Sequence, residues 1–273
     1  MIGLILSSSL LSLLILVALI YLLILIRPTK KAEVDPVLLC DYAHRGLHDK
    51  VTPENSLAAF SLACEEGLGM ELDVQLSRDG EVMVFHDYTL KRMTGEEGKL
   101  CERTAEELSQ LRLKDSDQTI PTFRQVLELV DGRTPLLVEL KGGGSDVSLC
   151  PKVAELLSTY QGPYCIESFN PLLLGEIRKH LPDAYRGLLY TNLYRDKENR
   201  TLKNFLPLCM ALNFHAKPNF IAYNKKDRDS LPVRLTTRLY KAPKFVWTVK
   251  TQEGVDLAHS LGEHPIFERR DKE

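Results

Sequence analysis

Short apolar runs alternate with longer segments of helical periodicity along most of the chain. Strands are expected where such a run stands between turn residues, and helices where apolar residues recur every three or four positions. The predicted strands are 37–43, 70–74, 82–86, 136–141, 164–168, 186–190, 209–215, 244–249 and 265–267. The predicted helices are 56–66, with Asn55 as its N-cap, 104–111, 121–130, 150–160 and 171–180.

Strands that alternate with helices indicate a parallel sheet covered by helices. Nine strand candidates compete for the eight places of a (β/α)8 TIM barrel, so one of them is surplus. The ends of several predicted strands carry histidine, acidic or basic residues, and in a TIM barrel this rim holds the active site. We therefore predict an α/β fold, a TIM barrel, with its functional site at the carboxyl ends of the strands.

The N-terminal segment has a different character from the rest of the chain. Residues 2–26 contain no charged side chain, a length that can cross a bilayer as a helix, and Arg27, Lys30 and Lys31 follow directly. We predict a transmembrane anchor at 1–27, a linker at 28–36 and the barrel domain at 37–270. The basic residues favour a cytoplasmic position for the barrel, and a cleaved signal peptide is the alternative.

Composition narrows the class of protein only slightly. Of the residues, 44% are hydrophobic and 26% are charged, as in an ordinary globular enzyme. A formal net charge of −2 gives no reason to expect a nucleic-acid partner. The six cysteines form no CxxC pair, which favours reduced, structural thiols and a reducing compartment. The oligomeric state is left open.

Two carboxylates stand two positions apart in the second predicted strand, at Glu71 and Asp73. In a strand they point to the same face, about 7 Å apart along the backbone. Like charges on one face are unfavourable unless a positive group lies between them, and carboxylate oxygens suit calcium or magnesium. His44 and His86 flank this pair in the sequence. The pattern indicates metal-assisted acid–base chemistry.

Seven short motifs follow one another in an order that resembles the glycerophosphodiester phosphodiesterase family. They cover roughly residues 38–250 and consist of His44-Arg45-Gly46, Pro53-Glu54-Asn55, Glu71-x-Asp73, His86-Asp87, Glu139-x-Lys141, Ser168-Phe169 and Trp247-Thr248-Val249. Each motif alone is weak, and their order makes the resemblance specific. It implies a barrel in which no helix separates the second and third strands.

The resemblance also implies the roles of the central residues. Glu71, Asp73 and Glu139 would bind a divalent cation, calcium or magnesium, which agrees with hard-ligand chemistry. His44 and His86 would transfer protons to and from the nucleophile and the leaving group, in an order that the sequence leaves open. The nucleophile would be water or the 2-hydroxyl of glycerol.

Further residues would bind the substrate. Arg45 and Lys141 would hold phosphate oxygens, although a salt bridge to Glu71 or Glu139 is the simpler interpretation of each. Trp247, the only tryptophan, would form an aromatic wall for the glycerol or simply pack in the core. Glu167 is a further polar candidate in the pocket.

Two departures from the family pattern concern the last part of the chain. Lys250 stands where asparagine is common, and 263–270 replaces a closing strand rich in glycine and aspartate. The expected activity is hydrolysis of a glycerophosphodiester to glycerol 3-phosphate and an alcohol. The alternatives are a lysophospholipase D that acts on membrane lysophospholipids and a catalytically silent barrel that serves as a binding module.

Overall fold

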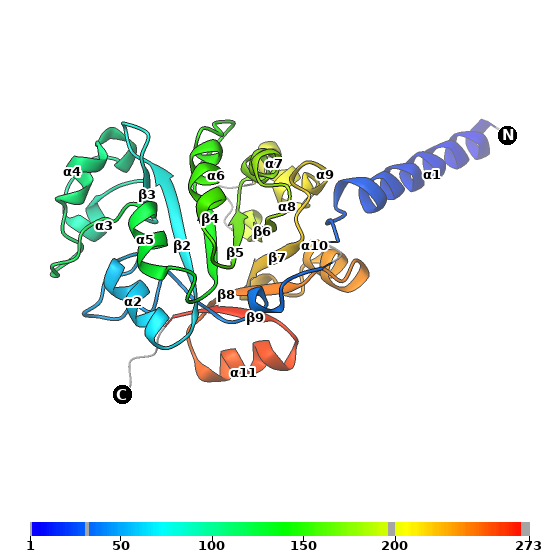
Figure 1. Cartoon of the computed structure of the whole chain (residues 1–273). Coiled ribbons are helices and arrows are strands. Elements are labelled where there is room, and N and C mark those ends of the chain that lie inside the picture. The colour runs from blue at the N-terminus through cyan, green and yellow to red at the C-terminus, as the bar shows by residue number, and fades with distance from the viewer. Residues whose placement is uncertain (1, 31–32, 196–199, 269–273) are drawn as a thin grey trace.

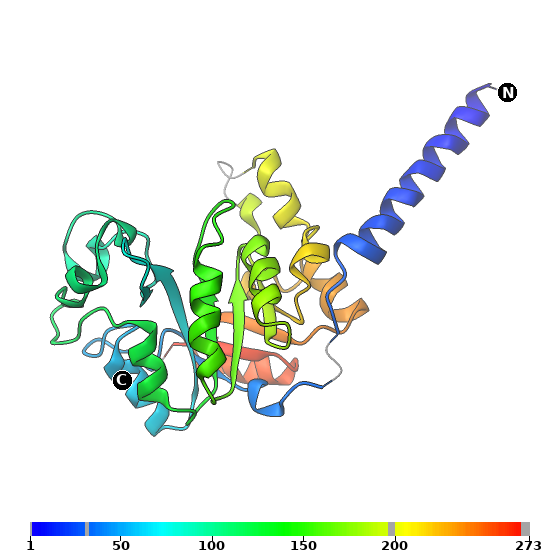
Figure 2. The same cartoon turned by 45° about the horizontal axis from the view of Figure 1, so that its top comes forward.

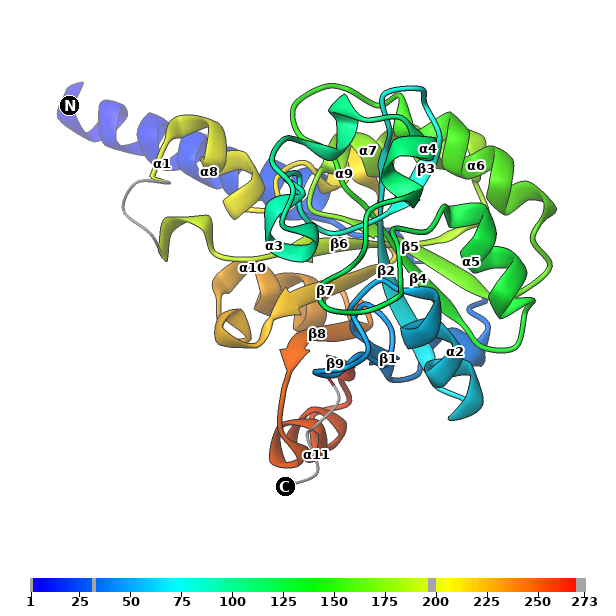
Figure 3. The ribbon, with the colours of Figure 1, turned by 90° about the vertical axis from the view of Figure 1, so that its left-hand side faces the viewer.

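Eight parallel strands of the described chain close into a barrel (Figures 1 and 3). The computed structural model describes residues 2–30, 33–195 and 200–268, except for the side chains of 2–9, 202 and 203. The barrel strands are β1 (Tyr42–Ala43), β2 (Gly69–Leu76), β4 (Leu136–Leu140), β5 (Tyr164–Ser168), β6 (Tyr185–Tyr190), β7 (Phe220–Asn224), β8 (Lys244–Val249) and β9 (His264–Phe267). β1 pairs with both β2 and β9 and so closes the sheet. The predicted TIM barrel is confirmed.

The surplus strand is β3 (Val82–Val84), which runs antiparallel to β2. A tight turn joins the two, with Ser77 donating its backbone N–H to the carbonyl of Glu81 at 3.0 Å. No helix separates them, because a two-stranded antiparallel connection needs only a turn. The candidate in excess of eight, 82–86, is therefore a real strand, but it lies outside the parallel barrel.

Two strand predictions are wrong. Most of 37–43 precedes the short β1, and Pro36–Leu38 forms a 3-10 turn. The run 209–215 is not a strand: it follows helix α8 (Leu202–Leu208) and enters α9 (Asn213–Ala216). The seventh barrel strand is β7 instead. Met210 of this run packs in the same core cluster as Ile26. Short apolar runs do not distinguish a strand from a buried helix.

Helices cover the outside of the barrel (Figures 2 and 3). The longer ones in the barrel domain are α2 (Leu57–Glu65), α5 (Phe123–Val130), α6 (Leu149–Thr159), α7 (Pro171–His180) and α11 (Gln252–Ser260), and the shorter ones are α3 (Lys91–Thr94), α4 (Ala105–Ser109) and α10 (Leu231–Arg234). The helices predicted from periodicity are confirmed within two residues. The predicted cap of α2 is wrong, because the Ser56 hydroxyl, not Asn55, accepts the N–H of Ala59 at 3.1 Å.

Successive residues of each strand point alternately out of the barrel and into it, so they belong to two different hydrophobic cores. Outward residues such as Met70, Leu72 and Val138 pack against the helices. Inward residues near the amino ends of the strands, such as Leu137 and Phe220, fill the barrel. Further along the same inward rows the apolar residues give way to carboxylates, because positions two apart share a face. The barrel is thus apolar at its base and acidic at its carboxyl rim.

At the N-terminus, α1 (Ile2–Ile20) continues into a π-helical turn (Tyr21–Leu25) and projects away from the barrel (Figures 1 and 2). The Tyr21 hydroxyl donates to the Cys209 carbonyl at 2.9 Å, so the base of this segment is attached to the barrel domain. In the described part of the chain, none of the helices combines the length and apolar character that a membrane span requires. Part of the predicted anchor (residue 1, the side chains of 2–9), part of its linker (31–32) and the predicted domain end (269–270) lie outside the described residues.

Candidate active site

Three carboxylates meet inside the rim of the barrel. Glu71 and Asp73 point inward from β2, and Glu139 lies opposite Asp73 on β4. One oxygen from each of the three residues lies within 4.8 Å of the others, and all three side chains are buried. The strand pairing predicted from the sequence therefore brings the proposed metal ligands together.

Cationic and amide groups surround this acidic cluster. Lys141 Nζ lies 3.0 Å from Glu139 and 3.5 Å from Asp73. The backbone N–H of Arg45 donates to Glu71 at 2.8 Å, and the Asn55 amide donates to Asp73 at 2.8 Å. Asn55 is thus a site residue that was mistaken for a helix cap.

The three carboxyl groups differ in their pKa. Burial, reinforced by the other carboxylates, raises the pKa of Glu71 well above its usual value and that of Glu139 to about 7. Burial acts on Asp73 in the same direction, but Lys141 and Arg45 outweigh it and lower the pKa of Asp73. The cluster therefore carries more acidic groups than its cationic neighbours can balance, which favours an additional cation.

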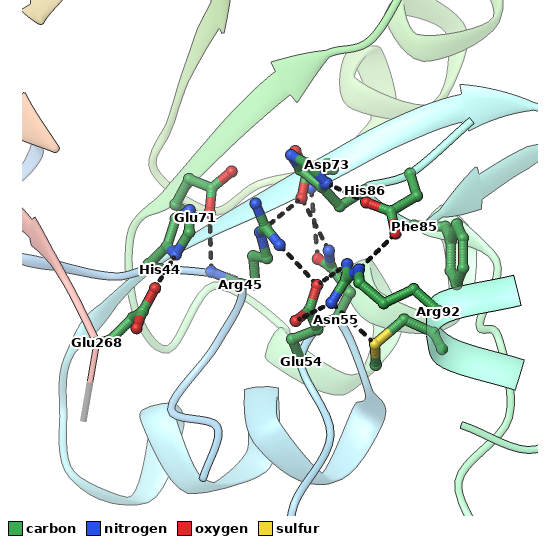
Figure 4. Close-up of polar contacts among 12 residues, drawn as sticks. His44, Arg45, Glu54, Asn55, Glu71, Asp73, Phe85, His86, Arg92 and Glu268 are labelled. Atoms are coloured by element: carbon green, nitrogen blue, oxygen red, sulfur yellow. Dashed lines mark hydrogen bonds and ion pairs between the residues drawn. The ribbon is translucent and has the colours of Figure 1, made fainter. Parts of the chain in front are cut away.

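Arg45 reaches the cluster through a strained turn after β1. Its φ is +56° and that of Gly46 is +78°, so two successive residues adopt left-handed backbone conformations. The Arg45 guanidinium contacts Glu54 at 2.6 Å and Asp73 at 3.5 Å, and Arg92 contacts the same Glu54 at 2.7 Å (Figure 4). The alternative of a salt bridge to Glu71 or Glu139 does not hold for Arg45 in the described structure, because its side chain pairs with Glu54 and Asp73 instead.

Each of the two histidines lies beside a carboxylate (Figure 4). His86 Nδ1 is 2.6 Å from Asp87, which also accepts a hydrogen bond from Arg92. His44 Nδ1 is 3.3 Å from Glu268, at the end of β9. Burial lowers the pKa of both imidazoles below its ordinary value, although the neighbouring carboxylates oppose this shift. Neutral imidazole is therefore the favoured form in this structure.

One pocket of about 100 Å³ joins these groups. It is lined by His44, Arg45, Glu71, His86, Glu139, Glu167, Phe169, Leu189, Trp247, Thr248 and Ile266. Trp247 donates its indole N–H to the Ala222 carbonyl at 3.1 Å and meets Phe169 edge-on, with ring centroids 5.5 Å apart. Six of the eight predicted site residues thus line a single cavity. The other two, Asp73 and Lys141, do not line it, but Lys141 contacts both Asp73 and the pocket residue Glu139.

The donor set fits a hard divalent cation. The Asp73 Oδ1 atom is buried and has no hydrogen-bond partner among the described residues, as expected for an oxygen that binds a metal. Three carboxylates at this separation suit calcium or magnesium, both of which take oxygen ligands. A second group, His44, His48 and Glu268, has comparable separations. It suits a cation less well, because Lys250 already contacts Glu268 at 2.7 Å.

Besides Asn55, two further residues of the site were missed or underestimated. Glu167 lies opposite Glu139 on β5 and is 1% exposed, with one carboxylate oxygen lacking a hydrogen-bond partner in the described structure. Its position two residues after a buried cysteine on a strand was the available signal. Glu268 gave no signal of its own, since its neighbour His44 is remote in sequence and only barrel closure brings them together.

An eight-stranded α/β barrel with a cluster of polar residues at its carboxyl rim places this chain among the TIM-barrel proteins. A family model described as the glycerophosphoryl diester phosphodiesterase family matches residues 44–268. The chain belongs to this family.

Individual relatives agree with the family assignment. A glycerophosphodiester phosphodiesterase from Caldanaerobacter subterraneus is 38% identical over 162 residues, which cover 54% of this chain and 65% of the relative. Human glycerophosphodiester phosphodiesterase 1 is 38% identical over 111 residues, or 37% of this chain and 33% of that protein. The crystal structure of the Thermotoga maritima glycerophosphodiester phosphodiesterase has 27% identity and a TM-score of 0.64, covering 83% of this chain and 92% of the other. The matched segments thus span from a third to about two thirds of the two sequence relatives.

Proposed function

We propose that this protein is a metal-dependent glycerophosphodiester phosphodiesterase. Its reaction is hydrolysis of a glycerophosphodiester to glycerol 3-phosphate and an alcohol. The observation that carries the proposal is the convergence of the buried carboxylates Glu71, Asp73 and Glu139 with His44 and His86 around one pocket. Family membership supports the same reaction.

Glu71, Asp73 and Glu139 are the proposed ligands of calcium or magnesium. When bound, such a cation polarises a phosphoryl oxygen and compensates the charge that develops on it. Burial and the neighbouring carboxylates raise the pKa of Glu71 and Glu139, which supports this role, because a bound cation would favour their ionised form.

His44 and His86 are the proposed acid–base pair. One imidazole accepts a proton from the attacking hydroxyl, and the other donates a proton to the departing alkoxide. Their neutral resting form suits the base directly, and the acid must acquire its proton before the leaving group departs. The attacking hydroxyl is that of water, or the glycerol 2-hydroxyl by way of a cyclic phosphate.

Arg45 and Lys141 are the proposed partners of the phosphate oxygens. Each is held in place by Asp73, at 3.5 Å from Arg45 Nε and 3.5 Å from Lys141 Nζ. A guanidinium and an ammonium fixed in a buried site stabilise developing negative charge without reorganising. Trp247 is the proposed apolar wall against the glycerol backbone, since its N–H is already bonded and its ring lines the pocket.

The products of the reaction test this proposal. We would incubate the protein with glycerophosphocholine and calcium or magnesium and follow the phosphorus signals by NMR. Glycerol 3-phosphate as the phosphorus-containing product supports the proposal, and a transient cyclic phosphate identifies the 2-hydroxyl as nucleophile. Phosphocholine as the product would contradict it, because the other ester bond would then have been cleaved.

A second candidate substrate is a lysophospholipid. An apolar pocket of about 150 Å³ adjoins the catalytic pocket and shares Phe169 and Leu189 with it. Met210 in its lining packs in the same cluster as Ile26, at the base of the N-terminal segment. This pocket supports the lysophospholipase D alternative, because an acyl chain would fit an apolar cavity. Competition between glycerophosphocholine and a lysophosphatidylcholine in one assay decides which substrate has the higher kcat/KM.

The N-terminal helix is proposed to associate with a membrane, with the barrel on the cytoplasmic side. The support is the exposure of its described apolar side chains, for example 59% for Leu10 and 53% for Leu16, and the basic residues Arg27 and Lys30 that follow. Co-flotation with lipid vesicles tests the association, with a protein lacking residues 1–26 as control. Loss of flotation on truncation is expected, and flotation that is the same for both proteins contradicts the proposal.

A further inference from the structure

Lys250 and Glu268, which belong to the two departures from the family pattern, are in contact with each other at the rim of the barrel. Lys250 Nζ lies 2.7 Å from one carboxylate oxygen of Glu268. The backbone N–H of Glu268 donates to the Val249 carbonyl at 3.0 Å, which fixes the main chain beside β8. The two departures therefore form one structural unit.

The other oxygen of Glu268 faces His44. It lies 3.3 Å from Nδ1, and the His44 backbone N–H donates to the Phe267 carbonyl at 2.8 Å. Nδ1 is buried and makes no hydrogen bond in the described structure, so the Glu268 carboxylate at 3.3 Å is the acidic group placed to become its partner. A carboxylate beside Nδ1 retains the proton there and leaves Nε2 free for the substrate side of the ring.

The second histidine has the same arrangement from different parts of the chain. His86 Nδ1 faces Asp87, and Asp87 is held by Arg92, just as Glu268 is held by Lys250. Asp87 follows His86 directly in the sequence, whereas Glu268 reaches His44 only because β9 pairs with β1. Each imidazole thus has a carboxylate at Nδ1 and a cation behind that carboxylate.

We propose that Glu268 is the positioning residue of His44 and that Lys250 holds the Glu268 carboxylate in place. This inference rests on the proposed phosphodiesterase function. The other charged or titratable groups that face His44 are Arg45, His48 and Asp73. None of these supplies an acceptor to Nδ1 in the described structure. A hydrogen bond that is long before substrate binds is common in catalytic sites, so 3.3 Å is compatible with the role.

The first test is Glu268→Gln, which keeps the size of the side chain and removes its charge. We expect kcat for glycerophosphocholine to fall about 10- to 100-fold, as for other residues that orient a reactive group, with KM within about twofold. Glu268→Asp should recover part of the lost kcat. Glu253→Gln, an exposed carboxylate on the neighbouring α11, is the matched control and should leave both constants unchanged.

The pH profile adds a result that a purely structural role would not produce. Glu268 raises the pKa of His44 against the effect of burial, so its replacement should move to lower pH the limb of kcat/KM that reports His44. This is the acid limb where His44 is the base, and the alkaline limb where it is the acid. The Glu253→Gln profile should coincide with that of the wild type.

A second variant keeps the test independent of folding. Lys250 is 61% exposed, so Lys250→Met should fold normally and lower kcat several-fold. In the Glu268→Gln background the same change should have no further effect, because Lys250 acts through Glu268. An unchanged kcat in folded Glu268→Gln and in Lys250→Met, or a change in KM alone, would overturn the inference. A wild-type protein with no turnover would instead overturn the proposed function itself.

Discussion

At the scale of single residues, the conformation of the turn after β1 explains how the Arg45-Gly46 pair contacts two of the proposed metal ligands. The left-handed conformations of Arg45 and Gly46 direct the Arg45 N–H to Glu71 and its guanidinium toward Asp73. A glycine is required at position 46 for a second reason. A Cβ there would lie 2.9 Å from the Cβ of Ala59, so the turn also packs directly against α2.

We predict that Gly46→Ala destabilises the protein more than Gly80→Ala does. Both glycines have φ near +80°, but a Cβ at Gly80 meets nothing within 4 Å. Gly80→Ala should therefore cost about 1 kcal/mol from backbone strain alone. Gly46→Ala should cost a further 1–3 kcal/mol, roughly, from overpacking. Urea unfolding of both variants measures the difference, and equal losses would show that the contact with Ala59 does not matter.

The histidines lead to a prediction about pH. Burial lowers the pKa of His44 and His86 from the ordinary 6.5, so each takes up a proton only at lower pH. The general base must be neutral, and kcat/KM should therefore decline only below pH 6.5. A profile of kcat/KM at constant metal concentration tests this. An acid limb centred above pH 7 would mean that the base is a different group or is not buried.

At the scale of elements, the pairing of β2 with β4 is what concentrates the charge. Asp73 and Glu139 are directly opposite each other, and Glu167 on β5 continues the row. Much of this could be predicted from alternation within each strand. The identity of the seventh strand could not, because 209–215 and 220–224 are both short apolar runs and only tertiary packing decides between them.

The burial of Glu139 predicts how the metal-free protein responds to pH. Its pKa of about 7 exceeds the unfolded value of about 4.5, so the folded state binds more protons between these two values. The free energy of unfolding should therefore fall as pH rises from 4.5 to 7. Glu139→Gln lacks this ionisation, so in chelator its stability relative to the wild type should increase with pH. Melting curves at pH 5 and pH 8 check this, and a pH-independent difference would contradict it.

The same cluster predicts stabilisation by metal. Calcium or magnesium at about 100 times its Kd should add about 2.7 kcal/mol to the free energy of unfolding. For a domain of this size that corresponds to a rise in Tm of roughly 5–10 °C. Glu139→Gln should reduce the rise, and Glu253→Gln should not. Equal shifts in all three proteins would mean that the cation binds elsewhere.

At the scale of the whole molecule, barrel closure determines what sequence reasoning could and could not find. The eight expected site residues lie in motifs that resemble the family pattern, and this resemblance was sufficient to predict that they belong to one site. Glu268 lies in a segment without a motif, and its partner His44 stands at the opposite end of the barrel domain. Only the pairing of β1 with β9 makes them neighbours.

Closure also changes the interpretation of the divergent last strand. From sequence alone, the divergent last strand at 263–270 was the support for a catalytically silent barrel. In the structure, Lys250 contacts Glu268 and Glu268 lies beside His44, while Glu263 pairs with Arg228 at 2.8 Å and accepts from Tyr223 at 2.6 Å. The segment therefore has a defined place in the barrel and at the site, which argues against the silent alternative.

The most direct test of the central claim is the turnover of glycerophosphocholine by the full chain with calcium or magnesium, then with excess chelator. His44→Ala and His86→Ala are measured beside the wild type under the same conditions. The account predicts turnover that chelator abolishes and that falls at least about 100-fold in each variant. Turnover that persists in chelator, or in both folded variants, would contradict a metal-dependent, two-histidine phosphodiesterase.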